Sequence, residues 1–185
     1  MTFQLRPLIV SVACLLTSGS ALADVLYQQL PTDPAQNQWS DAATGSPYLQ
    51  AIPALAGATL DKIVWWGFHG PLSMGESADA FEVLLNGTAV AGSLTKEADL
   101  TYAGLTRYTL DIADIALTAT EIGVWNTSLD VEWIWSGAPG NDTAGNPATA
   151  FRLEGTRATS VPEPTTLALL GLAGTALLRT RRARA

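Results

Sequence analysis

Two-residue alternation of apolar and polar side chains is the feature that most constrains the fold of this 185-residue chain. In the segment TRYTLDIA, Tyr108, Leu110 and Ile112 occupy every second position, and polar or charged residues stand between them. Successive side chains of a β-strand point to opposite faces of the sheet, so this pattern predicts a strand with one buried face. Long windows with the apolar spacing of an amphipathic helix are missing, which favours an all-β fold.

Turn signals divide the chain into short strands. The segment AFEVLLNGTAVAG predicts a hairpin, because Asn86-Gly87 suits the two positive-φ positions of a type I′ turn. The segment LDKIVWWGF has apolar residues on both faces, which predicts a central strand covered on both sides. VLYQQL and YLQAI are predicted edge strands, and VEWIWSG and AFRLEG are further strands. About seven to nine short strands predict an antiparallel β-sandwich, jelly-roll-like, over residues 24–155.

The N-terminal 23 residues have the layout of a secretory signal peptide. Arg6 supplies a basic start, residues 7–16 form an apolar stretch, and Ala21 and Ala23 form an A-x-A cleavage site. An uncleaved membrane anchor is the alternative. Cys14, the only cysteine, would leave with this leader, so the exported domain must be held together by a packed core rather than by disulfides.

The C-terminal end combines two prolines, an apolar stretch and a cluster of arginines. Residues 165–178 carry no charge and would span roughly 21 Å as a helix, less than the roughly 30 Å hydrocarbon core of a bilayer. Pro162 and Pro164 prevent this helix from extending backwards, so the preceding peptide stays extended and accessible to a protease. The positive-inside rule places the basic end in the cytoplasm. The basic residues are Arg179, Arg181, Arg182 and Arg184.

Val161-Pro162-Glu163-Pro164, the apolar stretch and the arginines together resemble the PEP-CTERM sorting signal of Gram-negative bacteria, also known as the ice-binding protein C-terminal domain. The resemblance covers residues 162–185, with residues 156–161 as a tether. It implies a transient inner-membrane anchor through a short transmembrane helix over residues 165–178. An exosortase-type enzyme would then recognise the motif, cut near it and release the protein to the surface or the biofilm matrix. A permanent membrane anchor that is never processed is the alternative.

The charge of the central part excludes one class of partner. Residues 24–161 contain 5 Lys/Arg and 16 Asp/Glu, a formal net charge of −11. Such a surface repels phosphates, so we expect no nucleic acid partner.

Residues suited to catalysis or metal binding are few. His69 is the only histidine, which excludes a histidine-rich metal centre, and we expect it to be an ordinary loop residue bonded to backbone or water. Asp130 and Glu132 are a candidate carboxylate pair on one face of a predicted strand. The loop GNDTAGN, residues 140–146, resembles a Ca²⁺ loop but lacks its ligand spacing. We therefore expect no enzyme activity and no cofactor, with Ca²⁺ as the one candidate ion.

Tryptophans are the candidate ligand-binding residues. Trp65 and Trp66 are neighbours on one predicted strand and must face opposite ways, so at least one lies on an outer face, under a loop or against another sheet. An exposed tryptophan on a rigid sheet suits stacking on a sugar ring. The candidate sugar-stacking residues are Trp65, Trp66, Trp133 and Trp135.

These features predict a non-catalytic exported protein of the cell surface or extracellular matrix, associated with exopolysaccharide. The alternative is a secreted carbohydrate-active enzyme or an ice-binding protein. An enzyme would need a cleft with two facing carboxylates. An ice-binding surface would need a regular threonine array, and the threonines here are scattered.

Overall fold

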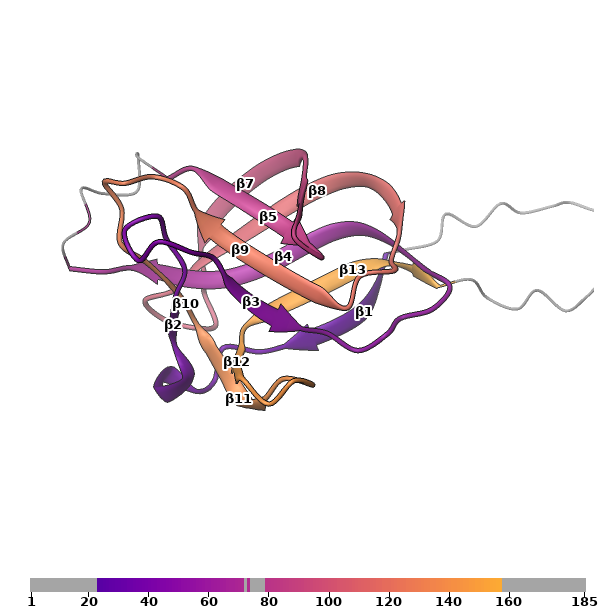
Figure 1. The fold of residues 1–185 in the computed structure, drawn as a ribbon, viewed down its shortest axis with the longest axis horizontal. Helices are drawn as coiled ribbons and strands as arrows, with labels where there is room; N and C mark the ends of the chain where they lie inside the picture. Colours follow the sequence, from indigo (N-terminus) through magenta and orange to yellow (C-terminus); the bar gives the residue numbers. More distant parts are fainter. Residues whose placement is uncertain (1–22, 72, 74–78, 158–185) are drawn as a thin grey trace, which may run out of the picture.

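The computed structural model describes residues 23–71, 73 and 79–157, and within them the chain forms thirteen strands and one short 3-10 helix (Figure 1). In chain order the elements are β1 (Asp24–Gln29), η1 (Pro34–Gln36), β2 (Gln38–Trp39), β3 (Tyr48–Ala51), β4 (Ala58–His69), β5 (Phe81–Leu85), β6 (Thr88–Val90), β7 (Gly92–Ala98), β8 (Thr106–Ala116), β9 (Glu121–Asn126), β10 (Trp133–Trp135), β11 (Gly137–Asn141), β12 (Pro147–Thr149) and β13 (Phe151–Arg157).

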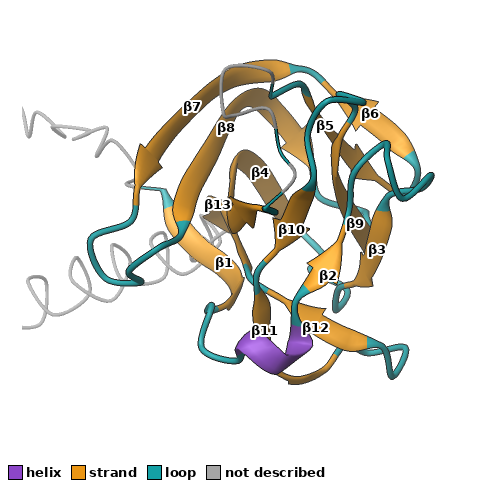
Figure 2. Cartoon of the chain, turned by 90° about the vertical axis from the view of Figure 1, so that its left-hand side faces the viewer, coloured by secondary structure: helices purple, strands orange, loops and turns teal. Residues whose placement is uncertain are grey.

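The long strand β4 is the centre of a seven-stranded sheet. Along one edge it pairs first with β13 and then with β10, and along the other edge it pairs with β8. Strands β1, β2 and β7 extend this sheet outward from β13, β10 and β8. A second sheet has the order β3-β9-β5-β6, and β11 and β12 form a separate pair near η1 (Figure 2). All strand pairs are antiparallel, as predicted.

The two larger sheets enclose the main hydrophobic core, which confirms the predicted all-β class and sandwich-like packing. Trp65 of β4 stacks on Tyr108 of β8, with ring centroids 5.5 Å apart and planes 8° from parallel. Phe81, at the start of β5, packs edge-on against Trp133 of β10 at 5.0 Å. Other core residues from both sheets include Ile63, Val83, Leu110, Ile122, Val124, Leu153 and Phe151.

The outer face of β4 is covered by a second, smaller cluster. Val64 and Trp66 point away from the main core and pack with three alanines of the β11–β12 region. Tyr102 and Leu105 close this cluster from the β7–β8 connection. The prediction of a central strand covered on both sides is confirmed, and so is the divergence of Trp65 from Trp66.

The predicted hairpin is also confirmed. Asn86 and Gly87 have φ values of 49° and 74° between β5 and β6, the positive-φ pair that the sequence suggested. Strands β1 and β3 each pair with one neighbour only, as predicted for edge strands.

Three predictions need correction. The described residues form thirteen strands rather than seven to nine, because β2, β7, β9, β11 and β12 were not predicted; β7, for example, is exposed on both faces and shows no alternation. β13 continues through Arg157, which pairs with Ala58, so the first two residues of the predicted tether belong to the sheet. Asp130 and Glu132 precede β10 rather than lying on a strand, so the face-sharing argument for this carboxylate pair is wrong.

Several predictions fall outside the described residues: the signal peptide up to residue 22, including Ala21, the sorting motif at residues 161–164, the helix at residues 165–178 and the terminal arginines. Ala23 is described and is exposed. In the part of the chain that the structure describes, no helix has the length and apolar character to cross a bilayer.

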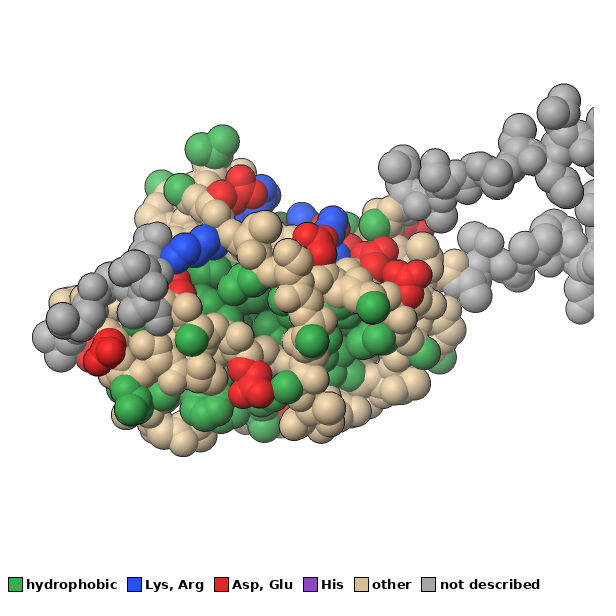
Figure 3. All heavy atoms as spheres, turned by 90° about the horizontal axis from the view of Figure 1, so that it is seen from above, with side chains coloured by type: hydrophobic (Ala, Val, Ile, Leu, Met, Phe, Trp, Pro, Cys, Tyr) green, Lys and Arg blue, Asp and Glu red, His purple; other side chains and the backbone are tan. Residues whose placement is uncertain are grey.

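The side of the sandwich between β6 and β8 is open. Apolar side chains line an opening of about 400 Å³ there, among them Leu85, Val90, Ile112, Ile115 and Leu117. Seen from above, the molecule shows hydrophobic side chains gathered in the middle of the face, with acidic side chains around them (Figure 3).

Candidate functional site

The four candidate tryptophans are buried. Trp65, Trp133 and Trp135 lie in the main core, and Trp66 lies in the outer cluster with 2% of its surface exposed. Two of the four indoles also bond within the fold: Trp135 Nε1 donates to the Ala150 carbonyl at 2.8 Å, and Trp66 Nε1 donates to Asp99 Oδ2 at 2.7 Å. The expectation that these rings stack on sugars is wrong, because core and hairpin packing removes them from the surface.

The tryptophan that is exposed is Trp39 of β2, with 45% of its surface accessible. It pairs with Ile134 of β10, and Ile134 pairs with Phe68 of β4. Directly paired residues share one face of a sheet, and this is the outer face because Trp133 and Trp135 on either side point into the core. We call Trp39, Ile134 and Phe68 the aromatic strip.

A groove of about 390 Å³ lies next to the aromatic strip and shares Phe68 with it. Residues 31–37 form one wall, and residues 102–105 form the other. Uncharged side chains make up its whole lining. The lining residues are Pro31, Thr32, Pro34, Asn37, Phe68, Tyr102, Ala103, Gly104, Leu105 and Ser136.

The wall at residues 102–105 is fixed to β4 through Asp99. The Trp66 indole Nε1 donates to Asp99 Oδ2 at 2.7 Å. The backbone N–H groups of Thr101 and Tyr102 donate to Asp99 Oδ1 at 2.7 and 2.9 Å. Burial raises the pKa of Asp99, but these hydrogen bonds outweigh it and hold the pKa below its usual value. Asp99 therefore stays ionised and organises this loop.

The opposite wall is fixed by the start of β11. Gly137 N–H donates to Asn37 Oδ1 at 2.8 Å, and Asp33 accepts from Ala35 N–H at 3.0 Å to cap η1. A side chain at Gly137 would collide with the backbone of Asp33 and Gln36, so only glycine allows this close approach. Hydrogen bonds within the fold thus hold both walls of the groove in place.

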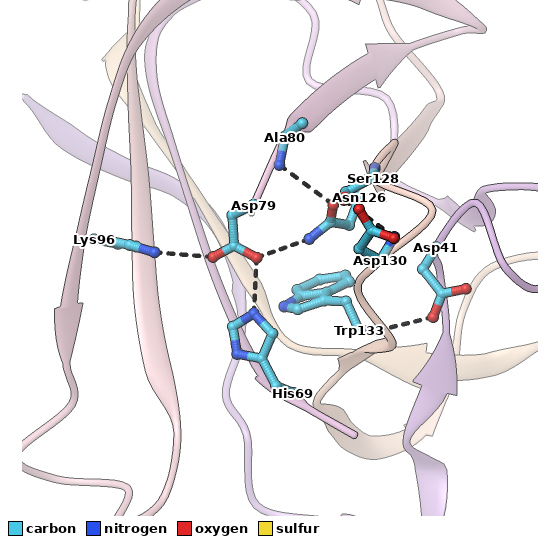
Figure 4. Close-up of polar contacts among 9 residues, drawn as sticks. All are labelled: Asp41, His69, Asp79, Ala80, Lys96, Asn126, Ser128, Asp130 and Trp133. Carbon is cyan, nitrogen blue, oxygen red and sulfur yellow. Dashed lines mark hydrogen bonds and ion pairs between the residues drawn. The ribbon is translucent and has the colours of Figure 1, made fainter. Parts of the chain in front are cut away.

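His69 lies at the other face of the same strand end, within a polar network (Figure 4). Its Nε2 is 2.7 Å from Asp79 Oδ1. The same carboxylate accepts from Asn126 Nδ2 at 2.9 Å and from Lys96 Nζ at 3.0 Å. The expectation that His69 bonds to backbone or water is thus wrong. His69 forms a histidine–carboxylate pair with Asp79, and the network around this pair joins β4, β7 and β9.

The rest of this network holds backbone groups. Asn126 Oδ1 accepts from Ala80 N–H at 3.3 Å and Ser128 N–H at 3.1 Å. Asp41, fully buried, accepts from Trp133 N–H at 2.8 Å. The network is therefore best suited to fixing the ends of the strands.

The predicted calcium loop is folded around Asp142. Its Oδ1 accepts from Ala144 and Asn146 N–H groups at 2.9 and 2.8 Å, and its Oδ2 accepts from Ala51 N–H at 2.9 Å. Burial raises the pKa of Asp142, but the hydrogen bonds from these backbone donors lower it by more. The pKa of Asp142 therefore lies below its usual value. No cluster of three potential metal ligands from His, Cys, Asp or Glu occurs within residues 23–71, 73 and 79–157. The Asp142 carboxylate thus stabilises a turn.

Comparison with known families explains the tail. Residues 160–182 match the PEP-CTERM protein-sorting motif, which includes the Val161–Pro164 segment. The chain is thus an exported all-β protein that carries a surface-sorting tail. It is a PEP-CTERM-domain-containing protein, whose motif implies processing by an exosortase-type enzyme. Comparisons with curated proteins and with solved structures gave no match.

Proposed function

We propose that this protein is a non-catalytic component of the cell surface or biofilm matrix that associates with exopolysaccharide. The sorting motif at residues 160–182 is the observation that carries this proposal, because it supports export and sorting to the cell surface, where an exopolysaccharide would be met. The acidic domain suits such a place, since its net charge of −11 over residues 24–161 keeps it soluble outside the cell.

The tail acts as a temporary inner-membrane anchor. Its uncharged stretch of 14 residues spans only roughly 21 Å as a helix, against a hydrocarbon core of roughly 30 Å. By the positive-inside rule the arginines beyond it would stay in the cytoplasm, and the flanking prolines would keep Glu163 out of the helix, on the outer side. Such an arrangement would make the motif accessible to a membrane-bound processing enzyme.

The anchor step is tested by replacing both motif prolines with alanine in the full chain. The Pro162→Ala, Pro164→Ala variant should remain in the inner membrane, and the Pro139→Ala control, at an exposed position of β11, should be exported normally. Cell fractionation measures the distribution, and mass spectrometry identifies the C-terminus of exported material. Normal export of the double variant, or exported protein that still ends at Ala185, would contradict the sorting role.

The polysaccharide association is tested with protein released by the producing bacterium. It should sediment together with the exopolysaccharide purified from the same culture. Addition of a metal chelator should leave the co-sedimenting fraction unchanged, because the proposed association requires no bound metal. The polysaccharide should gain no new reducing ends during incubation. A protein that stays in the supernatant rules out the association, and newly formed reducing ends rule out the non-catalytic role.

A further inference from the structure

We propose that the aromatic strip and the adjoining groove form one binding site for an uncharged stretch of a glycan chain. This inference rests on the proposed function and names the site and the ligand chemistry. Trp39 and Phe68 would stack on sugar rings, and the groove beside Phe68 would receive the next part of the chain.

The rings of the strip are arranged as a stacking platform. Trp39, Ile134 and Phe68 lie on three adjacent strands, so the outer two are about 10 Å apart, twice the strand spacing of about 4.8 Å. This separation allows each ring to contact a different sugar of one chain. A side chain at Gly70 would collide first with Glu132 Oε2 at 2.6 Å and would also contact Trp39 Cη2 at 3.2 Å, so Gly70 leaves room for both side chains at this end of the strip.

The lining of the groove matches the chemistry of a neutral sugar. Aromatic and proline rings suit the C–H faces, and the hydroxyl and amide groups of Thr32, Asn37 and Ser136 suit the sugar hydroxyls. All ten lining residues are uncharged, although the domain carries 16 acidic residues. The surrounding negative charge would repel a uronic acid chain, so a neutral segment is the better occupant.

The rigidity of the walls favours binding of a flexible chain. Asp99 fixes the loop at Tyr102, and Asn37 is held by Gly137, as described above. Preformed walls avoid the entropy cost of ordering a loop on binding. A groove of about 390 Å³ falls within the size range of small-ligand sites. It suits a glycan segment better than a stable protein partner, which would need a contact surface of roughly 800 Å² on each side.

The site is tested with exported protein and two forms of the host exopolysaccharide, native and carboxyl-reduced, by affinity electrophoresis. Trp39→Ala and Phe68→Ala should each weaken binding at least about tenfold, which corresponds to about 1.4 kcal/mol. Trp39→Phe should retain most of the affinity because it keeps a ring. Leu94→Ala, which truncates an exposed apolar residue on β7, is the matched control and should bind normally. Circular dichroism verifies that each variant is folded.

Four outcomes test this site and the general function separately. Loss of binding in Trp39→Ala and Phe68→Ala, together with normal binding of Leu94→Ala, supports the site. Wild-type binding that both variants retain overturns the site and leaves the association with exopolysaccharide standing. Absence of wild-type binding to either polymer overturns both proposals. Tighter binding of the native polymer than of the carboxyl-reduced polymer overturns the assignment of a neutral ligand.

Discussion

The two faces of the seven-stranded sheet use the same kind of residue for different purposes. On the inner face, Trp65 and Trp133 are fully buried among rings from both sheets. On the outer face, Trp66 is covered by the β11–β12 region, but Trp39 is not covered. The difference shows that burial follows from which elements lie over a strand, and that a tryptophan outside that cover is the better candidate for binding.

Removal of an inner ring should have the largest effect on stability. Trp65→Ala deletes a fully buried side chain that stacks on Tyr108, and the surrounding core can collapse only in part. The free energy of unfolding should fall by about 3–5 kcal/mol. Urea denaturation followed by circular dichroism measures this loss. A loss below about 1 kcal/mol would mean that the inner face is not the stabilising core described above.

Loss of the Asp99 charge should have an intermediate effect. Asp99→Asn keeps the shape of the side chain but weakens its bonds to the Trp66 indole and to the Tyr102 backbone, which should cost about 1–3 kcal/mol at pH 7. The pKa of Asp99 in the folded protein lies below the unfolded value of about 3.9. Its stabilisation is therefore complete above that value and is lost as the pH falls through the folded pKa.

The pH dependence gives this prediction a control. The difference in unfolding free energy between wild type and Asp99→Asn, measured by urea titrations at pH 7 and at successively lower pH, should shrink under acid conditions. A difference that stays constant at every pH would show that the charge of Asp99 does not hold the loop.

Removal of the uncovered outer ring should have the smallest effect on stability. Trp39→Ala truncates a side chain that is already 45% exposed at the edge strand β2, so the free energy of unfolding should change by about 0.5 kcal/mol or less. The same denaturation experiment measures it. A loss comparable to that of Trp65→Ala would place Trp39 among the structural rings and remove the distinction between the faces.

Local patterns were sufficient to predict most of the framework. Alternation predicted β8 and β13, and Asn86-Gly87 predicted the turn of the β5–β6 hairpin. Apolar residues on both faces predicted the central position of β4. These signals succeed because period and turn geometry are encoded within a few neighbouring residues.

The candidate site could not be predicted in the same way. Trp39 stands between Gln38 and Ser40 in a two-residue strand, without an alternating pattern, so nothing local places it beside Ile134 and Phe68. The cover over Trp66 comes from residues more than 30 positions away in the chain, such as Tyr102 and Ala138. Exposure of a ring is a property of such long-range packing, and a single sequence does not contain it in readable form.

The pairing of β1 with β13 gives the molecule a direction. Asp24 lies opposite Gly155, so both ends of the domain leave from one pole, next to the start of β4 (Figure 1). Phe68 lies near the other end of β4, about 33 Å further along at about 3.3 Å per residue. A domain held by either of its ends would accordingly present the pole that carries Phe68 away from its point of attachment.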